Sequence, residues 1–185
     1  MNLIDKVKLS SSVTVKKYRE MEKTQDRSGL SKFIDERLRE RYITPLQTSR
    51  KKNGFALMAC SCLLIETLEA FAKGWDSTDR KSESAFCNFF HREAGFKDFA
   101  ANAHEFYRHV RCGILHQGET TGGWLITRSQ KKPLLDGKTI HPTKFLTALS
   151  KSLGDYRGLL RSSDWESEPW RRFRKKMKAV IKNCE

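Results

Sequence analysis

The sequence has little proline and glycine, and it lacks a long uncharged run. Only 4 Pro and 11 Gly occur among 185 residues, which excludes collagen-like and proline-rich chains. The longest uncharged run, Asn53 to Ile65, has 13 residues and is too short to span a bilayer. The charged residues Asp5 and Lys6 lie where a secretory signal peptide would have its apolar region. We therefore expect a soluble, cytoplasmic protein without a membrane role.

Motifs for common cofactors and metals are also missing. The sequence contains no P-loop, no dinucleotide-binding glycine fingerprint, no H-E-x-x-H and no paired C-x-x-C. Cys60 and Cys62 would lie about 200° apart on a helix and cannot share a metal. Cys112 and His116 have i, i+4 spacing, but two ligands do not make a zinc site. We expect no cofactor and no metal, and the 5 cysteines to be reduced thiols.

What the sequence does contain is apolar residues and positive charge. Hydrophobic residues make up 38% of the chain, with 11 Phe and 4 Trp, too much for a disordered chain. The formal net charge is +14. Residues 51–100 are neutral, with 7 basic and 7 acidic side chains, so the excess lies on either side. A field of this size favours a polyanionic partner, and nucleic acid is the first class to consider.

Hydrophobic periodicity predicts an all-α bundle with a small β-hairpin. Apolar residues at helical spacing predict a helix from Ser31 that Pro45 stops, a central buried helix from Gly54 to Lys73, and a helix from Lys97 to His116. A hairpin insertion is expected at about 123–137, turning at Asp136 and Gly137. It precedes the last two helices, the second of them basic and at about 165–183.

The expected organisation is one domain. Residues 1–30 are polar and weakly periodic and are expected to form a loosely attached arm, in which residues 13–18 could add a short strand or a turn of helix. Residues 31–185 would form a single helical domain.

The stretch with chemical potential ends the helix from Lys97. Two His and two Arg fall within residues 108–116. Imidazole can exchange a proton with a ribose 2′-hydroxyl or a leaving oxygen, and Arg can hold developing charge on phosphorus. His116 lies near a helix C-terminus, where the dipole favours the imidazolium. The alternative is helix capping, in which Arg and His satisfy the last carbonyls near Gly118.

An ideal helix would separate the two principal side chains. Five residues correspond to about 140° around the helix axis, so Arg111 and His116 would not face the same point. Either Gly113 lets the helix loosen, or a second protomer completes the site.

The same residues resemble a known family. Arg111-x-x-x-x-His116, at the end of a long bundle helix, resembles the R-x(4–6)-H signature of the HEPN superfamily. The wider pattern resembles one plasmid- and bacterium-borne HEPN group over roughly residues 30–160. The matching segments are Asn53-Gly54-Phe55-Ala56, Leu63-Leu64-Ile65-Glu66-Thr67-Leu68-Glu69, Phe106-Tyr107, Arg111-Cys112-Gly113-Ile114-Leu115-His116-Gln117-Gly118-Glu119-Thr120 and Gly123-Trp124.

The resemblance implies an all-helical domain that pairs as a homodimer and cuts RNA without a metal. Arg111 and His116 of each protomer would line a cleft between the two. Family members of this kind act as toxins or phage-defence effectors, some under control of an antitoxin. Two departures stand out: Cys112 takes the place of a polar residue in many active members, and Gly118 takes the place of a tyrosine that some members carry and modify.

Further residues are candidates for supporting roles. Glu66, His109 and Gln117 are possible positioning groups or substrate contacts, although the helix could equally emerge into solvent at Glu66, as we expect it to do at Glu69. The basic C-terminal helix could simply pack and solvate its charges, or it could bind RNA without sequence preference. Its candidate RNA-binding residues are Arg171, Arg172, Arg174, Lys175, Lys176 and Lys178.

Two functions compete with the ribonuclease. One is a non-catalytic HEPN-like module that binds RNA or a protein through the same cleft, which Cys112 favours. The other is a basic helical protein associated with nucleic acid, in which Arg111-x(4)-His116 is a coincidence.

Overall fold

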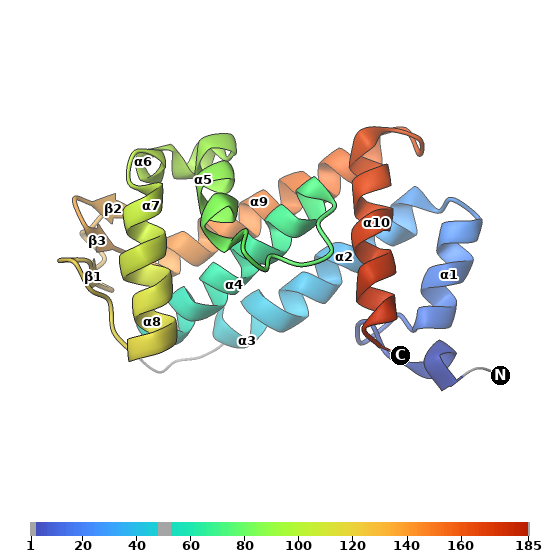
Figure 1. Ribbon diagram of the computed structural model, residues 1–185, viewed down its shortest axis with the longest axis horizontal. Helices are drawn as coiled ribbons and strands as arrows, with labels where there is room; N and C mark the ends of the chain where they lie inside the picture. The colour runs from blue at the N-terminus through green and yellow to red at the C-terminus, as the bar shows by residue number, and fades with distance from the viewer. Residues whose placement is uncertain (1–2, 48–52, 185) are drawn as a thin grey trace.

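The computed structural model describes residues 3–47 and 53–184. The first two residues of the expected N-terminal arm and the last residue of the expected helical domain lie outside the described residues, as do residues 48–52. Three long helices, α2, α4 and α9, cross the middle of the molecule (Figure 1). The shorter helices α5 to α8 gather at one end of the long axis, and α1 and α10 stand at the other. Helix α9 packs against both α2 and α4.

The helical segments, in chain order, are η1 (Leu3–Lys6), α1 (Val15–Lys23), α2 (Arg27–Leu38), η2 (Arg39–Ile43), α3 (Thr44–Gln47), α4 (Gly54–Lys73), α5 (Ser82–Arg92), η3 (Ala94–Phe96), α6 (Lys97–Ala100), α7 (Ala103–Phe106), η4 (Tyr107–Arg111), α8 (Cys112–Gln117), α9 (Pro142–Ser162) and α10 (Glu168–Lys182). The strands are β1 (Leu125–Ile126), β2 (Leu135–Asp136) and β3 (Thr139–Ile140). The prediction of an all-α fold with a small β insertion before the last two helices is confirmed.

The β insertion pairs differently from the expected hairpin. Strand β3 lies between the other two, antiparallel to β2 and parallel to β1. The tight turn at Asp136 and Gly137 is present, with Gly137 at φ 57°, but it joins β2 to β3 rather than closing a hairpin within 123–137. The expected range was wrong because β3, at Thr139–Ile140, follows the turn and is only two residues long.

Helix α4 has the bounds that its apolar stripe predicts. It ends at Gly74, whose φ of 65° places it in the left-handed region that glycine adopts most readily. A Cβ at Gly74 would come within 3.0 Å of the Arg172 Cα, so this position also allows α10 to approach. Over the described ranges α4 is the one helix apolar and long enough to cross a membrane, and 61% of its most apolar stretch is buried, as in the core helix of a soluble protein.

The expected helix over 97–116 is divided in the structure. Helices α6 and α7 are followed by a π-helical turn, η4, and then by the regular α-helix α8. The wider turn of η4 ends at Arg111. The carbonyl of His109 accepts a hydrogen bond from the Thr121 N–H at 2.9 Å. π-Helical turns are rare in proteins as a whole, but those that occur are often at functional sites. The position of η4 therefore favours Arg111 and the residues after it as a candidate site.

An aromatic cluster holds this segment in place. The Phe106 ring stacks on the Phe145 ring at a centroid distance of 5.7 Å and meets the Trp124 ring edge-on at 5.8 Å. Phe90 and Phe99 complete the cluster, and all five rings are at most 1% exposed. Because Phe106 and Val110 point into the core, Arg111 is directed elsewhere, toward Glu66 on α4.

The N-terminal 30 residues do not form a loose arm. Residues 15–23 are helical, and the side chains of Leu9, Val13, Val15 and Tyr18 are at most 5% exposed. The prediction was wrong because a small number of apolar residues is enough to fix a polar segment to the core when all of them face it. Tyr18, for example, lies 5.8 Å from Phe33 between ring centroids.

The next boundaries also differ from the prediction. Helix α2 begins at Arg27, with Asp26 rather than Ser31 as the N-cap, and its carboxylate accepts from the Gly29 N–H. The helix continues past Pro45 through η2 and α3. A proline ring clashes with the carbonyl four residues earlier in a regular helix, and the wider π-helical turn immediately before Pro45 relieves that clash.

Candidate functional site

Arg111 makes a buried ion pair with Glu66 on α4. The Arg111 Nε donates to Glu66 Oε1 at 2.9 Å, and the two side chains are only 16% and 9% exposed. The other oxygen, Glu66 Oε2, accepts from the Thr78 hydroxyl at 3.0 Å and the Ser82 hydroxyl at 2.8 Å. Glu66 could have emerged into solvent or oriented a candidate active-site residue. The structure shows it buried and paired with Arg111.

This network holds Arg111 in one orientation and in its charged form. Burial lowers the pKa of Arg111, but the Glu66 carboxylate more than offsets that effect, so the pKa lies above its ordinary value. The guanidinium carbon also lies 5.6 Å from the Tyr107 ring centroid, within the range of a cation–π interaction. Among the described residues, the Arg111 Nη2 has no hydrogen-bond partner, so it can still bind an anion.

His116 and Gln117 lie in the last turn of α8 and are exposed. Within residues 3–47 and 53–184 neither side chain forms a hydrogen bond or ion pair. Gly118 follows in the left-handed region at φ 69° and ends the helix. His116 is therefore not held as a C-cap, and its imidazole is accessible for proton exchange.

Gly113 does not loosen the helix between the two residues. It lies inside the regular helix α8, where an added Cβ would come within 2.5 Å of the Glu119 carbonyl oxygen. The glycine thus lets the following loop fold back closely. Since α8 is regular, Arg111 and His116 remain about 140° apart around its axis. Arg111 faces α4 and His116 faces solvent, and one chain does not bring the two together.

His109 has its own partners away from Arg111. Its Nδ1 lies 2.9 Å from the Thr121 hydroxyl, and its Nε2 lies 3.4 Å from Glu105 Oε2. Gly122, at φ 60°, sits so close that a Cβ would come within 2.6 Å of the imidazole. The structure therefore gives His109 contacts that secure the loop after α8, and does not join it to Glu66 and Arg111.

An apolar hollow adjoins Arg111. It has a volume of about 150 Å³ and is lined by Arg111 with Ala59, Cys62, Leu63, Ile114 and Leu115. Leu63 on α4 and Leu115 on α8 are 46% and 56% exposed, and Phe55, also on α4, is 40% exposed. Helix α4 was expected to be buried nearly all round, but this face is open. The spacing of Phe55, Ala59 and Leu63, four residues apart, was the available signal.

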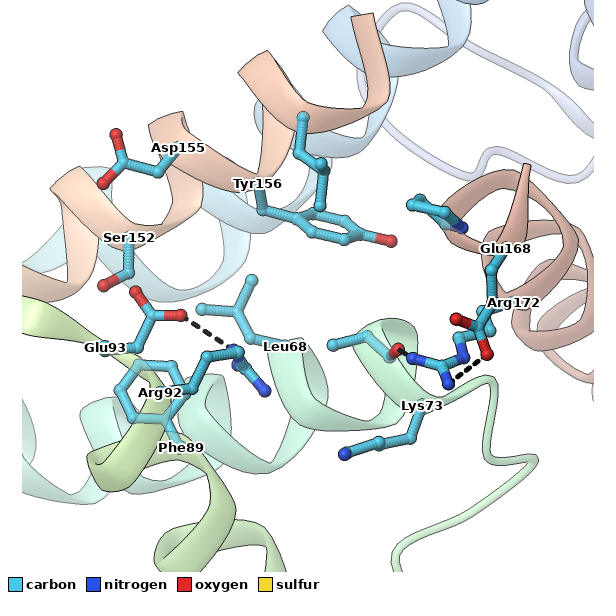
Figure 2. A pocket seen from close by; sticks show the side chains of 13 residues that line it. Leu68, Lys73, Phe89, Arg92, Glu93, Ser152, Asp155, Tyr156, Glu168 and Arg172 are labelled. Carbon is cyan, nitrogen blue, oxygen red and sulfur yellow. Dashed lines mark hydrogen bonds and ion pairs between the residues drawn. The ribbon is translucent and has the colours of Figure 1, made fainter. Parts of the chain in front are cut away.

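A larger cavity lies between the ends of α4, α5, α9 and α10, with a volume of about 290 Å³ (Figure 2). Its arginines are already engaged. Arg92 pairs with Glu69 and Glu93, and Arg172 pairs with Glu168 and donates to the Ala72 carbonyl. Glu69 was expected to face solvent, but it is 0% exposed because α5 covers it with Arg92. This cavity offers no free guanidinium to a substrate.

The six basic candidates on α10 divide into two groups. Arg172, Arg174 and Lys176 donate to backbone carbonyls of other segments, those of Ala72, Trp165 and Asp76. Arg171, Lys175 and Lys178 are exposed, with no ion pair to any described residue. Figure 1 places α10 at the opposite end of the molecule from α8, so this helix is no part of the Arg111 site.

No group of three or more His, Cys, Asp or Glu side chains that could hold a metal ion occurs in the described part of the chain. Its cysteines are free thiols. Comparisons with protein families, with curated proteins and with solved structures find no match for this chain.

Proposed function

We propose that the protein is a metal-independent endoribonuclease with Arg111 and His116 as its catalytic residues. The observation that carries this proposal is the Glu66–Arg111 pair. Two further hydroxyls, from Thr78 and Ser82, hold the carboxylate that orients the arginine. A cation that is pre-oriented in this way can stabilise developing phosphorane charge without reorganising during the reaction.

His116 supplies the acid–base chemistry. As a base, its imidazole takes the proton of a ribose 2′-hydroxyl, and the 2′-oxygen attacks the adjacent phosphorus. The bond from phosphorus to the 5′-oxygen breaks, and the imidazolium returns its proton to that oxygen. The products are a 2′,3′-cyclic phosphate and a free 5′-hydroxyl. This step needs no metal, cofactor, oxidant or reductant.

A homodimer resolves the divergence of the two side chains. Arg111 and His116 point to different sides of α8, so the Arg111 of one protomer would act with the His116 of its partner. The exposed Leu63 and Leu115 beside Arg111 provide apolar surface for such an interface. Gln117 extends from the same turn and would contact the substrate, whereas Glu66 is a positioning residue.

The biological setting follows from the HEPN resemblance alone. A cytoplasmic RNase of this type would serve as a toxin or a phage-defence effector, and an antitoxin or other regulatory protein would cover the cleft.

A second candidate is a non-catalytic module that binds RNA or a protein through the same cleft. The observation that favours it is Cys112, which lies next to Arg111 and contributes no strong hydrogen-bond donor.

Incubation with mixed RNA in EDTA separates the two candidates. Wild type, Arg111→Ala and His116→Ala would be compared side by side, with analysis of the product ends. The ribonuclease predicts cleavage by wild type alone, with 2′,3′-cyclic phosphate ends. Intact RNA in all three reactions, retained on a filter by wild type and less by Arg111→Ala, would establish the binding module instead. Equal cleavage by all three would contradict both residue assignments.

A further inference from the structure

The exposed cations of α10 form a single stripe. Arg171, Lys175, Lys178 and Lys182 follow at steps of four, three and four residues, which keeps them on one helical face. All four side chains are exposed, and none forms an ion pair within the described ranges. The rise of the helix places one positive charge about every 5.5 Å along this face. The set expected from the sequence omitted Lys182 and included Arg172, Arg174 and Lys176, which are engaged by backbone carbonyls.

The stripe borders a groove between α10 and α1. The groove has a volume of about 700 Å³ and is lined by Lys175, Lys178 and Lys182 on one side and by Arg19 and Glu22 on the other. Arg19 is held by Asp5 at 2.8 Å, and the Glu22 carboxylate accepts from the Tyr18 hydroxyl at 3.2 Å. Arg174 also lines the groove and pairs with Glu166 at 3.4 Å. Among the described residues, the three lysines are therefore the groove's unpaired cations, and they outnumber its one carboxylate, Glu22.

Folding does not explain the stripe. Like charges at i, i+3 and i, i+4 destabilise a helix, and the packing of α10 is provided by Trp170, Phe173 and Met177, each 0% exposed. Other basic residues of the same helix are used structurally, as Arg172 and Lys176 show. Four unpaired cations in one row are consistent with a ligand that carries a regular series of negative charges.

We propose that the α1–α10 groove binds the phosphate backbone of RNA at a distance from the Arg111 site. This inference rests on the RNA substrate of the proposed function and adds a second contact surface to it. Helix α9, with 21 residues, spans roughly 30 Å between the two ends of the molecule. The groove therefore holds a part of the RNA that flanks the cleavage point, and it does so without reading sequence.

Two other partners fit less well. An acidic protein would need accessible apolar or aromatic anchors at the centre of its interface. The described groove offers Ile181 and the ring of Tyr18, which is only 1% exposed. A membrane surface would need an apolar helix face to insert, but the aromatic face of α10 is buried. A row of charges with so little accessible apolar surface suits a linear polyanion.

The first test is RNA binding by anisotropy in EDTA with a labelled single-stranded oligonucleotide. Lys178→Gln/Lys182→Gln would be compared with Lys97→Gln/Lys131→Gln, which removes the same charge from exposed positions elsewhere. We expect the groove variant to bind roughly tenfold more weakly, with a salt dependence reduced by about 1.4 in log–log slope, or about 0.7 for each lost contact. Equal affinities of the two variants would overturn the proposal.

The second test separates this inference from the proposed function. If the ribonuclease is correct, the groove variant should cut long RNA with a raised KM and cut a dinucleotide at the wild-type rate. Unchanged cleavage of both substrates would overturn the groove and leave the ribonuclease standing. Weaker RNA binding by the groove variant, with no cleavage by wild type, would support the groove and contradict the ribonuclease. Binding to anionic phosphatidylserine vesicles but not to RNA would overturn the groove proposal in favour of a lipid surface.

Discussion

Helix α4 carries two buried glutamates three residues apart, and each pairs with an arginine from another helical segment. Glu66 binds Arg111 and also accepts from two hydroxyls, so both its oxygens are used. Glu69 binds Arg92 through one oxygen, while its buried Oε1 has no partner among the described residues. The Arg92 side chain is 40% exposed against 16% for Arg111. The same residue types thus produce one completed network and one incomplete pair.

The difference shows what a functional arginine requires. A buried charge pair is costly unless further hydrogen bonds satisfy it, and Thr78 and Ser82 supply these bonds only to Glu66. Burial raises the pKa of Glu69 above its ordinary value in spite of Arg92. The Glu66 network is therefore suited to hold a cation still, whereas the Glu69 pair chiefly links α4 to α5.

The largest effect should separate the two arginines in catalysis. Arg111→Ala should lower the rate of RNA cleavage by roughly 10²–10³-fold, the usual loss on removing a transition-state donor. Arg92→Ala should leave the rate within about threefold of wild type, because Arg92 contacts no proposed catalytic group. The check is single-turnover cleavage of a labelled RNA in EDTA. Comparable losses in both variants, with both still folded by circular dichroism, would break the comparison.

Replacing each pair with apolar residues should give opposite stability changes. Glu66→Met/Arg111→Met should lower the free energy of unfolding by about 2–4 kcal/mol, because it also strands the Thr78 and Ser82 hydroxyls. Glu69→Met/Arg92→Met should be neutral or stabilising, by up to about 2 kcal/mol, since it removes an unsatisfied buried charge. Urea unfolding measures both values. A larger loss from the second replacement would show that the unpaired Oε1 does not weaken the Glu69 pair.

A single hydroxyl should report on the network. Ser82→Ala removes the 2.8 Å hydrogen bond to Glu66 and should cost about 1.5 kcal/mol, as a hydrogen bond to a charged group does. It should also slow cleavage by freeing Arg111 to move. Ser84→Ala, at an exposed position of the same helix, is the matched control. Equal unfolding free energies for the two variants would remove Ser82 from the network.

The smallest effect should be a pH dependence specific to Glu69. Its raised pKa means that, above the ordinary carboxyl value of about 4.3, the folded protein binds more protons than the unfolded chain. The contribution of Glu69 to stability is then lost as the pH rises through its folded pKa. Glu69→Gln should therefore gain stability relative to wild type between mildly acidic and neutral pH. A constant difference in urea unfolding across that range would contradict the shift.

Local pattern was sufficient for the elements that bury a regular stripe. The bounds of α4 were predicted correctly, because an apolar face at helical spacing is a local signal. Pro142 likewise stands at the first position of α9, where proline is locally favoured. The failures lie where a few contacts override a polar local sequence. Tyr18 buries an N-terminal segment that composition marked as a loose arm.

The candidate site was predicted in part. Arg111 and Glu66, 45 positions apart, were each singled out, but no local signal shows that they touch. His109 has the same residue type as His116 and lies about two helical turns before it, yet in the fold it contacts Thr121 and Glu105. The basic character of α10 was evident, whereas the direction of each cation depends on which neighbours it meets.

The sequence by itself determined the helical class, the main buried helix, the positive charge and the identity of the residues that could carry phosphodiester chemistry. These are properties of composition and of spacing within one element. Only the tertiary structure decided that Glu66 is completed and Glu69 is not, that Arg111 and His116 diverge on α8, and that three lysines of α10 face a groove with α1. Such pairings depend on which helices meet, because burial and hydrogen bonding are set by neighbours distant in the chain.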